Sequence, residues 1–227
     1  MKQIRILGLS SATNTVGAAV VDAERVLSES SVSGDVARSE KLIGLADRAL
    51  GQASLKIGDV DAVAVAIGPG SYSGLRGAVA TAKGLAASLD IPVISVPTLD
   101  AAAYNFIGRS GTVLVAINAC RDDYNAALFG FSGGSMKRLT DDVTMKLERI
   151  TELISQVRGE LTVACDRDIS GHFKSRTVAF APVISAIPYA RNVATIGLAK
   201  FRKKDFEDLI LLKPVYSHKP NIREFSK

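Results

Sequence analysis

The sequence predicts a mixed α/β protein built from two structurally similar halves. Short runs of β-branched and aliphatic residues, bounded by turn residues, alternate with segments in which apolar residues recur at helical spacing. The order of three strands, a helix and a strand occurs twice along the 227 residues. Hydrophobic residues make up 47% of the chain and charged residues 22%, a balance that excludes a disordered protein.

The first half shows this order most clearly. Turn residues join the first three strands closely, which predicts an antiparallel meander. The segment 62–67 alternates valine and alanine and is expected to be a buried strand. The expected elements are strands over 4–9, 16–21 and 25–31, a helix over 37–52, a strand over 62–67, a helix over 73–89 and a strand over 93–96.

The second half repeats the order and then adds a helix. We expect strands over 112–117, 124–131 and 135–139, a helix over 146–158, a strand over 161–165, a helix over 188–204 and an extended segment over 209–215. Pro97–Thr98 is the expected junction, with Thr98 capping a helix that runs through Phe106. The predicted domains are thus 1–97 and 98–227, and the C-terminal helix and basic tail could pack back on the first half.

Cysteine usage and the N-terminus indicate a cytoplasmic protein. Cys120 and Cys165 are flanked by strand-like residues and are expected to be reduced core thiols, because two cysteines make no disulfide framework. Arg5 interrupts the first apolar run, so the N-terminus is interpreted as a strand and not a signal peptide. No apolar stretch approaches the roughly 20 residues that a membrane span requires.

The net charge of +5 is concentrated at the C-terminus. The last 28 residues carry eight basic and four acidic side chains. Such a segment can contact phosphate-rich partners. It is also typical of a solvated helix end, where cations stabilise the negative end of the helix dipole. The second interpretation is favoured, because no aromatic residue interrupts Arg202–Lys204 as a stacking platform for bases.

The most informative segment is Gly68–Arg76, a glycine-rich turn between a buried strand and a helix. Backbone N–H groups at such a turn form a candidate anion site, with Gly68, Gly70, Ser71 and Gly74 as its residues. The glycine spacing matches neither a Walker A loop nor the dinucleotide fingerprint. A nucleotide site therefore stays a minority interpretation of this loop.

The helix over 73–89 has two distinct flanks. Small residues gather on one flank (Gly74, Gly77, Ala78, Thr81, Gly84 and Ser88), whereas the other is aliphatic (Leu75, Val79, Ala82, Ala86 and Leu89). An interior glycine costs a helix about 0.8–1 kcal/mol relative to alanine. Three of them suggest that a close backbone approach compensates. The aliphatic flank fits a sheet, and the small flank would let another helix come close.

Residues Gly68–Arg76 closely resemble the segment GPGSFTGLR of the bacterial TsaB (YeaZ) family. Ile6–Ala12 is similar to that family's ILAIDTS strand, Arg38–Leu42 to its HSERL segment and Pro214–Tyr216 to its PVYLR segment. The resemblance implies an actin/Hsp70-like (ASKHA) fold of two RNase H-like halves. It also implies a role in making N6-threonylcarbamoyladenosine (t6A) at position 37 of tRNA.

Family members are non-catalytic paralogues of the transferase TsaD, with which they pair through N-terminal helices, and the ATPase TsaE joins the pair. The resemblance therefore implies that the chain alone has no cofactor, and that ATP, Mg²⁺ and a metal held by the partner serve the complex. The isolated chain is expected to form a homodimer and to contact tRNA indirectly, or weakly through its basic C-terminal segment. Together with the helix flanks, the resemblance gives a candidate interface of Leu42, Leu45, Tyr72, Leu75, Arg76, Val79, Thr81, Lys83 and Gly84.

The residue types are consistent with a non-catalytic role, and no catalytic residue is expected. Ser10 stands where the fold's first phosphate loop would carry a magnesium-positioning aspartate. The histidines, His172 and His218, are too far apart in sequence for an H-x-x-x-H metal motif. The alternative is an ASKHA small-molecule kinase that uses the 68–76 loop for phosphate. A nuclease is disfavoured because Ser10 and Gly68 occupy the strand ends that would need carboxylates.

Overall fold

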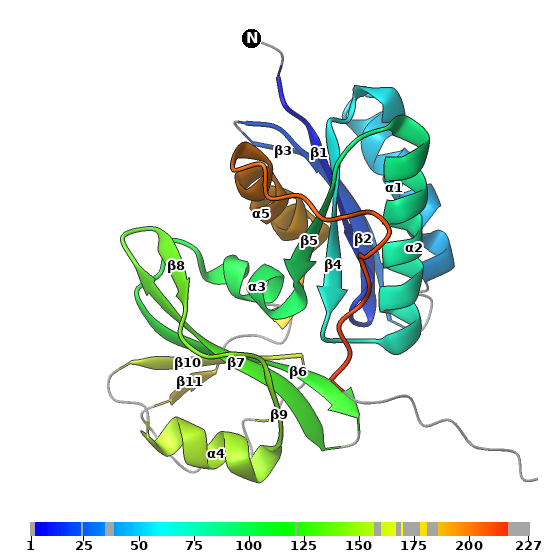
Figure 1. The fold of residues 1–227 in the computed structure, drawn as a ribbon. Coiled ribbons are helices and arrows are strands. Elements are labelled where there is room, and N and C mark those ends of the chain that lie inside the picture. The colour runs from blue at the N-terminus through cyan, green and yellow to red at the C-terminus, as the bar shows by residue number, and fades with distance from the viewer. Residues whose placement is uncertain are drawn as a thin grey trace, which may run out of the picture.

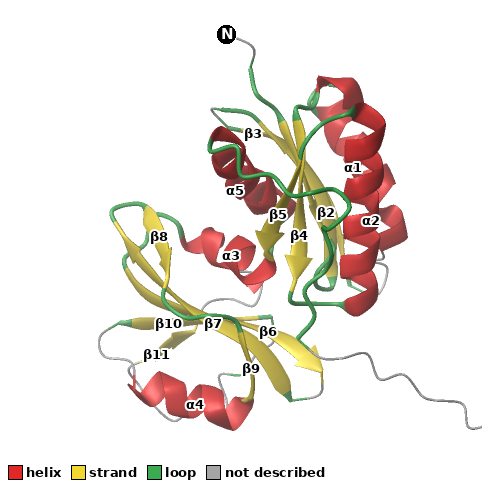
Figure 2. Cartoon of the chain, viewed as in Figure 1, coloured by secondary structure: helices red, strands yellow, loops and turns green. Residues whose placement is uncertain are grey.

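The computed structural model describes residues 3–23, 25–34, 39–120, 122–156, 160–166, 169, 178–180 and 186–217. Two sheets lie one beyond the other, each with helices packed against it (Figure 1). Figure 2 shows the same arrangement by element type, with helices on both faces of the first sheet. The expected mixed α/β fold is confirmed.

The first sheet has the strand order β3-β2-β1-β4-β5. β1, β2 and β3 form the expected antiparallel meander, whereas β4 and β5 join it in parallel. The strand bounds are β1 Ile6–Ser10, β2 Thr15–Val21, β3 Val26–Ser33, β4 Ala62–Gly68 and β5 Val93–Pro97.

The second sheet repeats this topology. Its order is β11-β10-β6-β7-β8, so β6, β7, β8, β10 and β11 take the places of β1 to β5. The parallel pairs recur as well, since β10 lies parallel to both β6 and β11. The strand bounds are β6 Gly111–Cys120, β7 Asp123–Ser132, β8 Ser135–Arg138, β10 Leu161–Cys165 and β11 Val178–Phe180, and an unexpected strand β9, Val143–Lys146, pairs with β7. The two-fold repetition read from element order is confirmed.

Helices cover both faces of the first sheet because its strands alternate in side-chain size. In β4, Val63 and Val65 face α1 (Leu42–Gln52) and α2 (Tyr72–Leu89), whereas Ala62, Ala64 and Ala66 face α5 (Ala190–Arg202). The short alanines let α5 come close. α3 (Thr98–Ala103) lies between the two sheets, and α4 (Leu147–Gln156) packs on the second.

α5 follows the second sheet in the chain but packs on the first, against β1, β2, β4 and β5. Glu29 of β3 receives hydrogen bonds from the backbone N–H and the guanidinium of Arg191 at the helix start. In the helix interior, the buried Asn192 donates to Ala101 O and Asn105 Oδ1. The first half is therefore completed by residues far beyond position 97.

Three expected elements differ from the structure. The helix expected over 37–52 begins at Leu42 after a 3₁₀ turn, Ser39–Lys41, and residues 37 and 38 lie outside the described residues. Pro97, not Thr98, occupies the N-cap position of α3. The segment 209–215 begins with a turn, because Asp208 accepts hydrogen bonds from the backbone there, so it is not extended over its whole length. Its last residue, Val215, donates to Ile67 O of β4.

The described part of the chain contains a buried thiol at Cys165, as expected, whereas the side chain of Cys120 lies outside the described residues. No helix among the described residues is long and apolar enough to cross a membrane.

Candidate functional site

The glycines between β4 and α2 are explained by close packing within the chain. Gly68 and Gly70 have φ values of +127° and +157°, which favour glycine. A Cβ at any of the three loop glycines would overlap a backbone carbonyl oxygen: that of Val215 for Gly68, of Ala12 for Gly70 and of Ser11 for Gly74. The close approach expected at Gly74 is thus made to this chain's own first half.

The backbone amides of this loop are already engaged. Gly68 N donates to Thr98 Oγ1 over 3.1 Å, and Gly74 N donates to Ser71 Oγ over 3.3 Å. Ser71 N donates to Ala12 O over 2.8 Å. Three of the four amides of the predicted anion site at Gly68, Gly70, Ser71 and Gly74 thus have acceptors inside the protein, which disfavours an anion there.

Four residues of the predicted partner interface lie in the interior instead. Leu42 and Leu75 have no exposed surface, and Leu45 and Val79 are 4% exposed. Leu42, Leu45 and Val79 belong to the core beneath α1 and α2, whereas Leu75 packs with Ala12 and the alanines of β4. Assigning these four to the interface is wrong, because the aliphatic flanks of both helices are used against the sheet.

The other five predicted interface residues, Tyr72, Arg76, Thr81, Lys83 and Gly84, reach the surface of α2. Between them the exposed face is made of small side chains, namely Ser73, Ala80, Ala87 and Ser88, with Gly77 half-buried. A Cβ on Gly84 would meet no atom within 4 Å, and the same holds for Gly44 on α1. This surface is flat enough for a second helix to approach closely.

An aromatic–cation cluster marks the start of α2. Arg76 Nη1 donates to the Tyr72 hydroxyl over 2.8 Å, and this hydrogen bond raises the pKa of Arg76. The Tyr72 ring lies 4.7 Å from the Tyr216 ring, centroid to centroid. Desolvation raises the pKa of Tyr216, and its neighbour Tyr72 adds to the effect. Tyrosine and arginine are the residue types that protein interfaces favour most.

Tyr216 belongs to a C-terminal segment that contacts α2, a contact that the sequence pattern does not predict. Lys83 Nζ donates to the carbonyl oxygens of Ile210 and Leu212, over 3.1 and 3.3 Å. Val215 N donates to Ile67 O of β4 over 2.7 Å. The Pro214–Tyr216 motif was a signal for this segment, but a spacing of over 120 residues hides the contact with Lys83.

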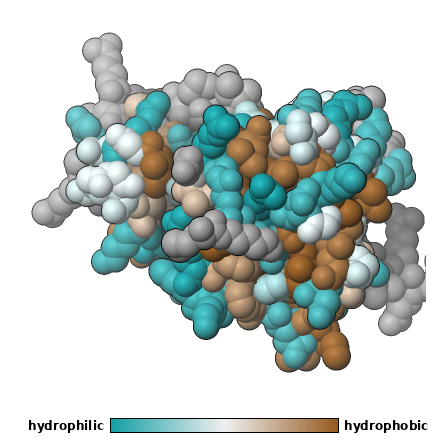
Figure 3. Space-filling view, turned by 90° about the horizontal axis from the view of Figure 1, so that it is seen from above, coloured by the Kyte–Doolittle hydropathy of each residue, from teal (hydrophilic) through white to brown (hydrophobic). Residues whose placement is uncertain are grey.

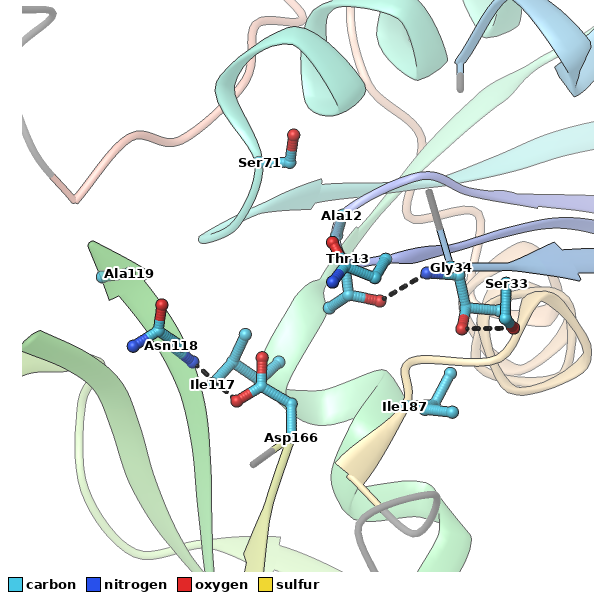
Figure 4. A pocket seen from close by; sticks show the side chains of 12 residues that line it. Ala12, Thr13, Ser33, Gly34, Ser71, Ile117, Asn118, Ala119, Asp166 and Ile187 are labelled. Atoms are coloured by element: carbon cyan, nitrogen blue, oxygen red, sulfur yellow. Dashed lines mark hydrogen bonds between the residues drawn. The ribbon is translucent and has the colours of Figure 1, made fainter. Parts of the chain in front are cut away.

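A pocket of about 440 Å³ lies between the two halves. In Figure 4, Asn118 of β6 and Asp166, which follows β10, lie across the pocket from Thr13 and Ser71 of the first half. Asn118 N donates to Asp166 Oδ1 over 2.9 Å. Asp166 is the one charged residue among the described residues that line it. The lining residues are Ala12, Thr13, Asn14, Thr15, Ser33, Gly34, Ser71, Ile117, Asn118, Ala119, Asp166 and Ile187.

Ser10, which stands where the fold's first phosphate loop would carry a magnesium-positioning aspartate, is buried. Ser10 is 2% exposed, and its hydroxyl has no hydrogen-bond partner among the described residues. In the described part of the chain, no three His, Cys, Asp or Glu side chains converge as metal ligands. His172 and His218 lie outside the described residues. The residues at this position therefore do not fit a metal ion.

Comparison with known proteins assigns the chain to a family. A family model described as TsaD, tRNA N6-adenosine threonylcarbamoyltransferase, matches residues 33–224. The chain belongs to the TsaD family. Within it, the expected resemblance to TsaB is confirmed by the tRNA threonylcarbamoyladenosine biosynthesis protein TsaB of Bacillus subtilis, 27% identical over 151 residues and covering 66% of each chain.

A transferase and a solved structure extend the comparison. A tRNA N6-adenosine threonylcarbamoyltransferase of Paracoccus denitrificans is 34% identical over 109 residues, 41% of this chain and 31% of that protein. The structure of YeaZ from Pseudomonas aeruginosa superposes with a TM-score of 0.80 at 22% identity, covering 94% of this chain and 99% of that one. The superposition shows that the two chains share a fold. The matches span less than two thirds of the length of either sequence relative.

Proposed function

We propose that this chain is a non-catalytic subunit in the threonylcarbamoylation of tRNA adenosine 37. In this proposal it pairs with a TsaD-type transferase through the exposed faces of α1 and α2, and a TsaE-type ATPase joins the pair. The observation that carries the proposal is the open, small-residue surface of α2 around Gly84. Small residues at a helix surface favour close helix–helix contact, because they let two backbones approach.

The family relationship supports a TsaD-type protein as the partner of this surface. Because the TsaD model covers both helices, a TsaD-type protein carries counterparts of α1 and α2. Related surfaces can meet about a two-fold or pseudo-two-fold axis, so two copies of this chain can also pair. We therefore propose a homodimer in isolation, which gives way to the heterodimer. A strict monomer in sedimentation at high micromolar concentration would contradict the homodimer.

The Gly84→Leu substitution tests the interface. The new side chain enters open space, so the thermal stability of the isolated chain should stay the same or rise slightly. On the partner side it should hold the facing helix away, at a cost of about 1–3 kcal/mol in lost packing. We expect at least a tenfold higher Kd for the TsaD-type transferase of the same organism in isothermal titration calorimetry.

The matched control is Arg149→Leu on α4, which also adds a leucine to an exposed helical position but lies on the second half. It should bind the transferase like the wild type. If Gly84→Leu also binds normally, α2 lies outside the contact and the proposed interface fails.

The alternative of an ASKHA small-molecule kinase is disfavoured by the site. The amides that would cradle a phosphate are engaged within the chain. The charged residue on the described pocket wall is Asp166, whose carboxylate repels a triphosphate. Calorimetric titration of the isolated chain with Mg-ATP tests this choice, and tight stoichiometric binding would favour the kinase.

A further inference from the structure

Exposed large hydrophobic side chains are concentrated near the C-terminal end of the described chain. Of the eleven such residues in the described ranges, five fall within residues 206–216. They are Phe206, Ile210, Leu211, Val215 and Tyr216, and Ile210 and Leu211 are the most exposed, at 85% and 73%. Because exposed apolar side chains that lie together mark interaction sites, this segment is a candidate for one.

We define Asp208–Tyr216 as the C-terminal strap. It is fixed to the layer that contains α1 and α2, because Leu212 is buried in the core that those two helices share. Lys83 of α2 holds the strap at the carbonyls of Ile210 and Leu212, and the stacking of Tyr216 on Tyr72 holds its far end. The strap is thus part of the same surface as α2.

The turn at the start of the strap orders its apolar tip. Asp208 Oδ1 accepts hydrogen bonds from the backbone N–H groups of Ile210 and Leu211, over 2.7 and 3.2 Å. Leu212 N donates to Asp208 O over 2.9 Å. With Leu212 anchored inward, Ile210 and Leu211 remain in solvent. An apolar tip that is already ordered loses little conformational entropy when a partner covers it.

The strap and α1 lie on opposite sides of α2 (Figure 1). Just before the strap, Glu207 N donates to Val93 O of β5, and within it Val215 N donates to Ile67 O of β4. α1 packs instead on β2 and β3. Hydrophobic atoms gather on the right of the space-filling view, the side on which Figure 1 places α1 and α2 (Figure 3). α2 therefore presents its small residues between two neighbouring elements.

The small residues on α2 leave open where a partner would find large apolar anchors. A specific, stable interface buries about 800 Å² on each partner and depends on a few large anchor residues. Tyr72 and Arg76 lie at the start of α2. The rest of its exposed face consists of Ser73, Ala80, Gly84, Ala87 and Ser88, which permit close approach but offer no large apolar anchor. Large apolar anchors lie on either side of it, at Ile43 of α1 and at Ile210 and Leu211 of the strap.

We infer that the C-terminal strap is a second part of the docking surface, in which Ile210 and Leu211 insert into apolar pockets of the TsaD-type transferase that covers α2. This inference rests on the proposed function, which names α1 and α2 but not the strap. Close helix contact at Gly84 sets the distance between the two proteins, and the strap supplies the apolar area that the small residues lack.

The double variant Ile210→Ser, Leu211→Ser tests the inference by calorimetric titration with the transferase. Both side chains are exposed, so the melting temperature of the isolated chain should not change. We expect the Kd to rise at least tenfold, equivalent to about 1.4 kcal/mol. The matched control is Leu139→Ser, Val143→Ser, which removes two exposed hydrophobics from the second half and should bind like the wild type.

A second variant tests whether the ordered backbone of the strap's tip contributes to binding apart from its apolar side chains. Asp208→Ala keeps Ile210 and Leu211 but removes the acceptor of their backbone N–H groups. We expect it to weaken binding by less than the double variant does. Binding of the double variant at wild-type strength would overturn the inference.

The outcomes also separate the inference from the proposed function. If Gly84→Leu weakens binding and the double variant does not, the interface stands and the strap is outside it. If the wild type does not bind the transferase, both proposals fail. If the double variant loses only self-association in sedimentation, the occupant is a second copy of this chain, and the assignment to the transferase is wrong.

Discussion

Gly197 of α5 lies directly over Ala64 of β4, so that a Cβ on Gly197 would overlap the Ala64 Cβ. A similar approach occurs at Gly8 of β1, where a Cβ would overlap the carbonyl oxygen of Ala190. These contacts explain how a helix from the end of the chain becomes part of the first half. Missing side chains on both surfaces let the helix and the sheet come into direct backbone contact.

Alanine substitutions at two helical glycines should therefore have opposite effects. Gly197→Ala should destabilise the protein by about 1–3 kcal/mol, because the new methyl forces α5 from the sheet. Gly84→Ala should stabilise it by about 0.5–1 kcal/mol, because the methyl meets open space and improves helix propensity. Urea unfolding of both variants measures the two values. A stabilised Gly197→Ala variant would contradict the packing described for α5.

The hydroxyls of Thr98 and Ser10 offer a second matched comparison. Thr98 Oγ1 accepts the buried Gly68 N–H, so Thr98→Val should cost about 1–3 kcal/mol for a donor left without an acceptor. The Ser10 hydroxyl is buried without a partner in the described residues, so Ser10→Ala should be neutral or slightly stabilising. Thermal or urea unfolding distinguishes the two, and equal losses at both sites would refute the assignment.

The raised pKa of Asp100 predicts that the stability of the protein depends on pH. Burial raises the pKa of its carboxyl above the ordinary 3.8, and this effect outweighs the opposing hydrogen bond from Arg138. The folded state then holds the proton more tightly than the unfolded state. The contribution of Asp100 to stability is therefore full below pH 3.8 and is lost as the pH rises through the folded-state pKa.

The measurement compares the wild type with Asp100→Asn, which cannot titrate. Unfolding free energies from pH 3 to pH 7 should show the wild type losing stability relative to the variant as the pH rises. The opposite trend would mean that pairing with Arg138 outweighs burial.

The proposed non-catalytic role predicts that the chain alone transfers no threonylcarbamoyl group. The described residues hold no cluster of metal-ligating side chains, and Ser10 cannot supply the charge of an aspartate. Incubation of the chain with tRNA and threonylcarbamoyl-adenylate should give no modified adenosine above background, whereas addition of the transferase and ATPase should produce it. Modification by the chain alone would refute the role.

The sequence by itself determined the order of strands and helices along the chain and the repetition of this order in the two halves. It also determined the loop at Gly68–Arg76 that carries the family resemblance. These features are local, because alternation, turn residues and helical spacing act over a few residues. The same reasoning placed Gly84 on an open surface, as the structure shows. The family resemblance, taken together with the helix flanks, assigned Leu42, Leu45, Leu75 and Val79 to a partner face, whereas the structure buries them against the sheet.

Only the tertiary structure decided where distant segments of the chain meet. Thr98 appeared in the sequence as a helix cap, but its hydroxyl accepts the amide of Gly68, thirty residues away. The strap meets Lys83 across more than 120 residues. Such contacts depend on the path of the whole chain. Because a single side chain, such as Lys83 or Leu212, makes each of them, they leave no repeating pattern in the sequence.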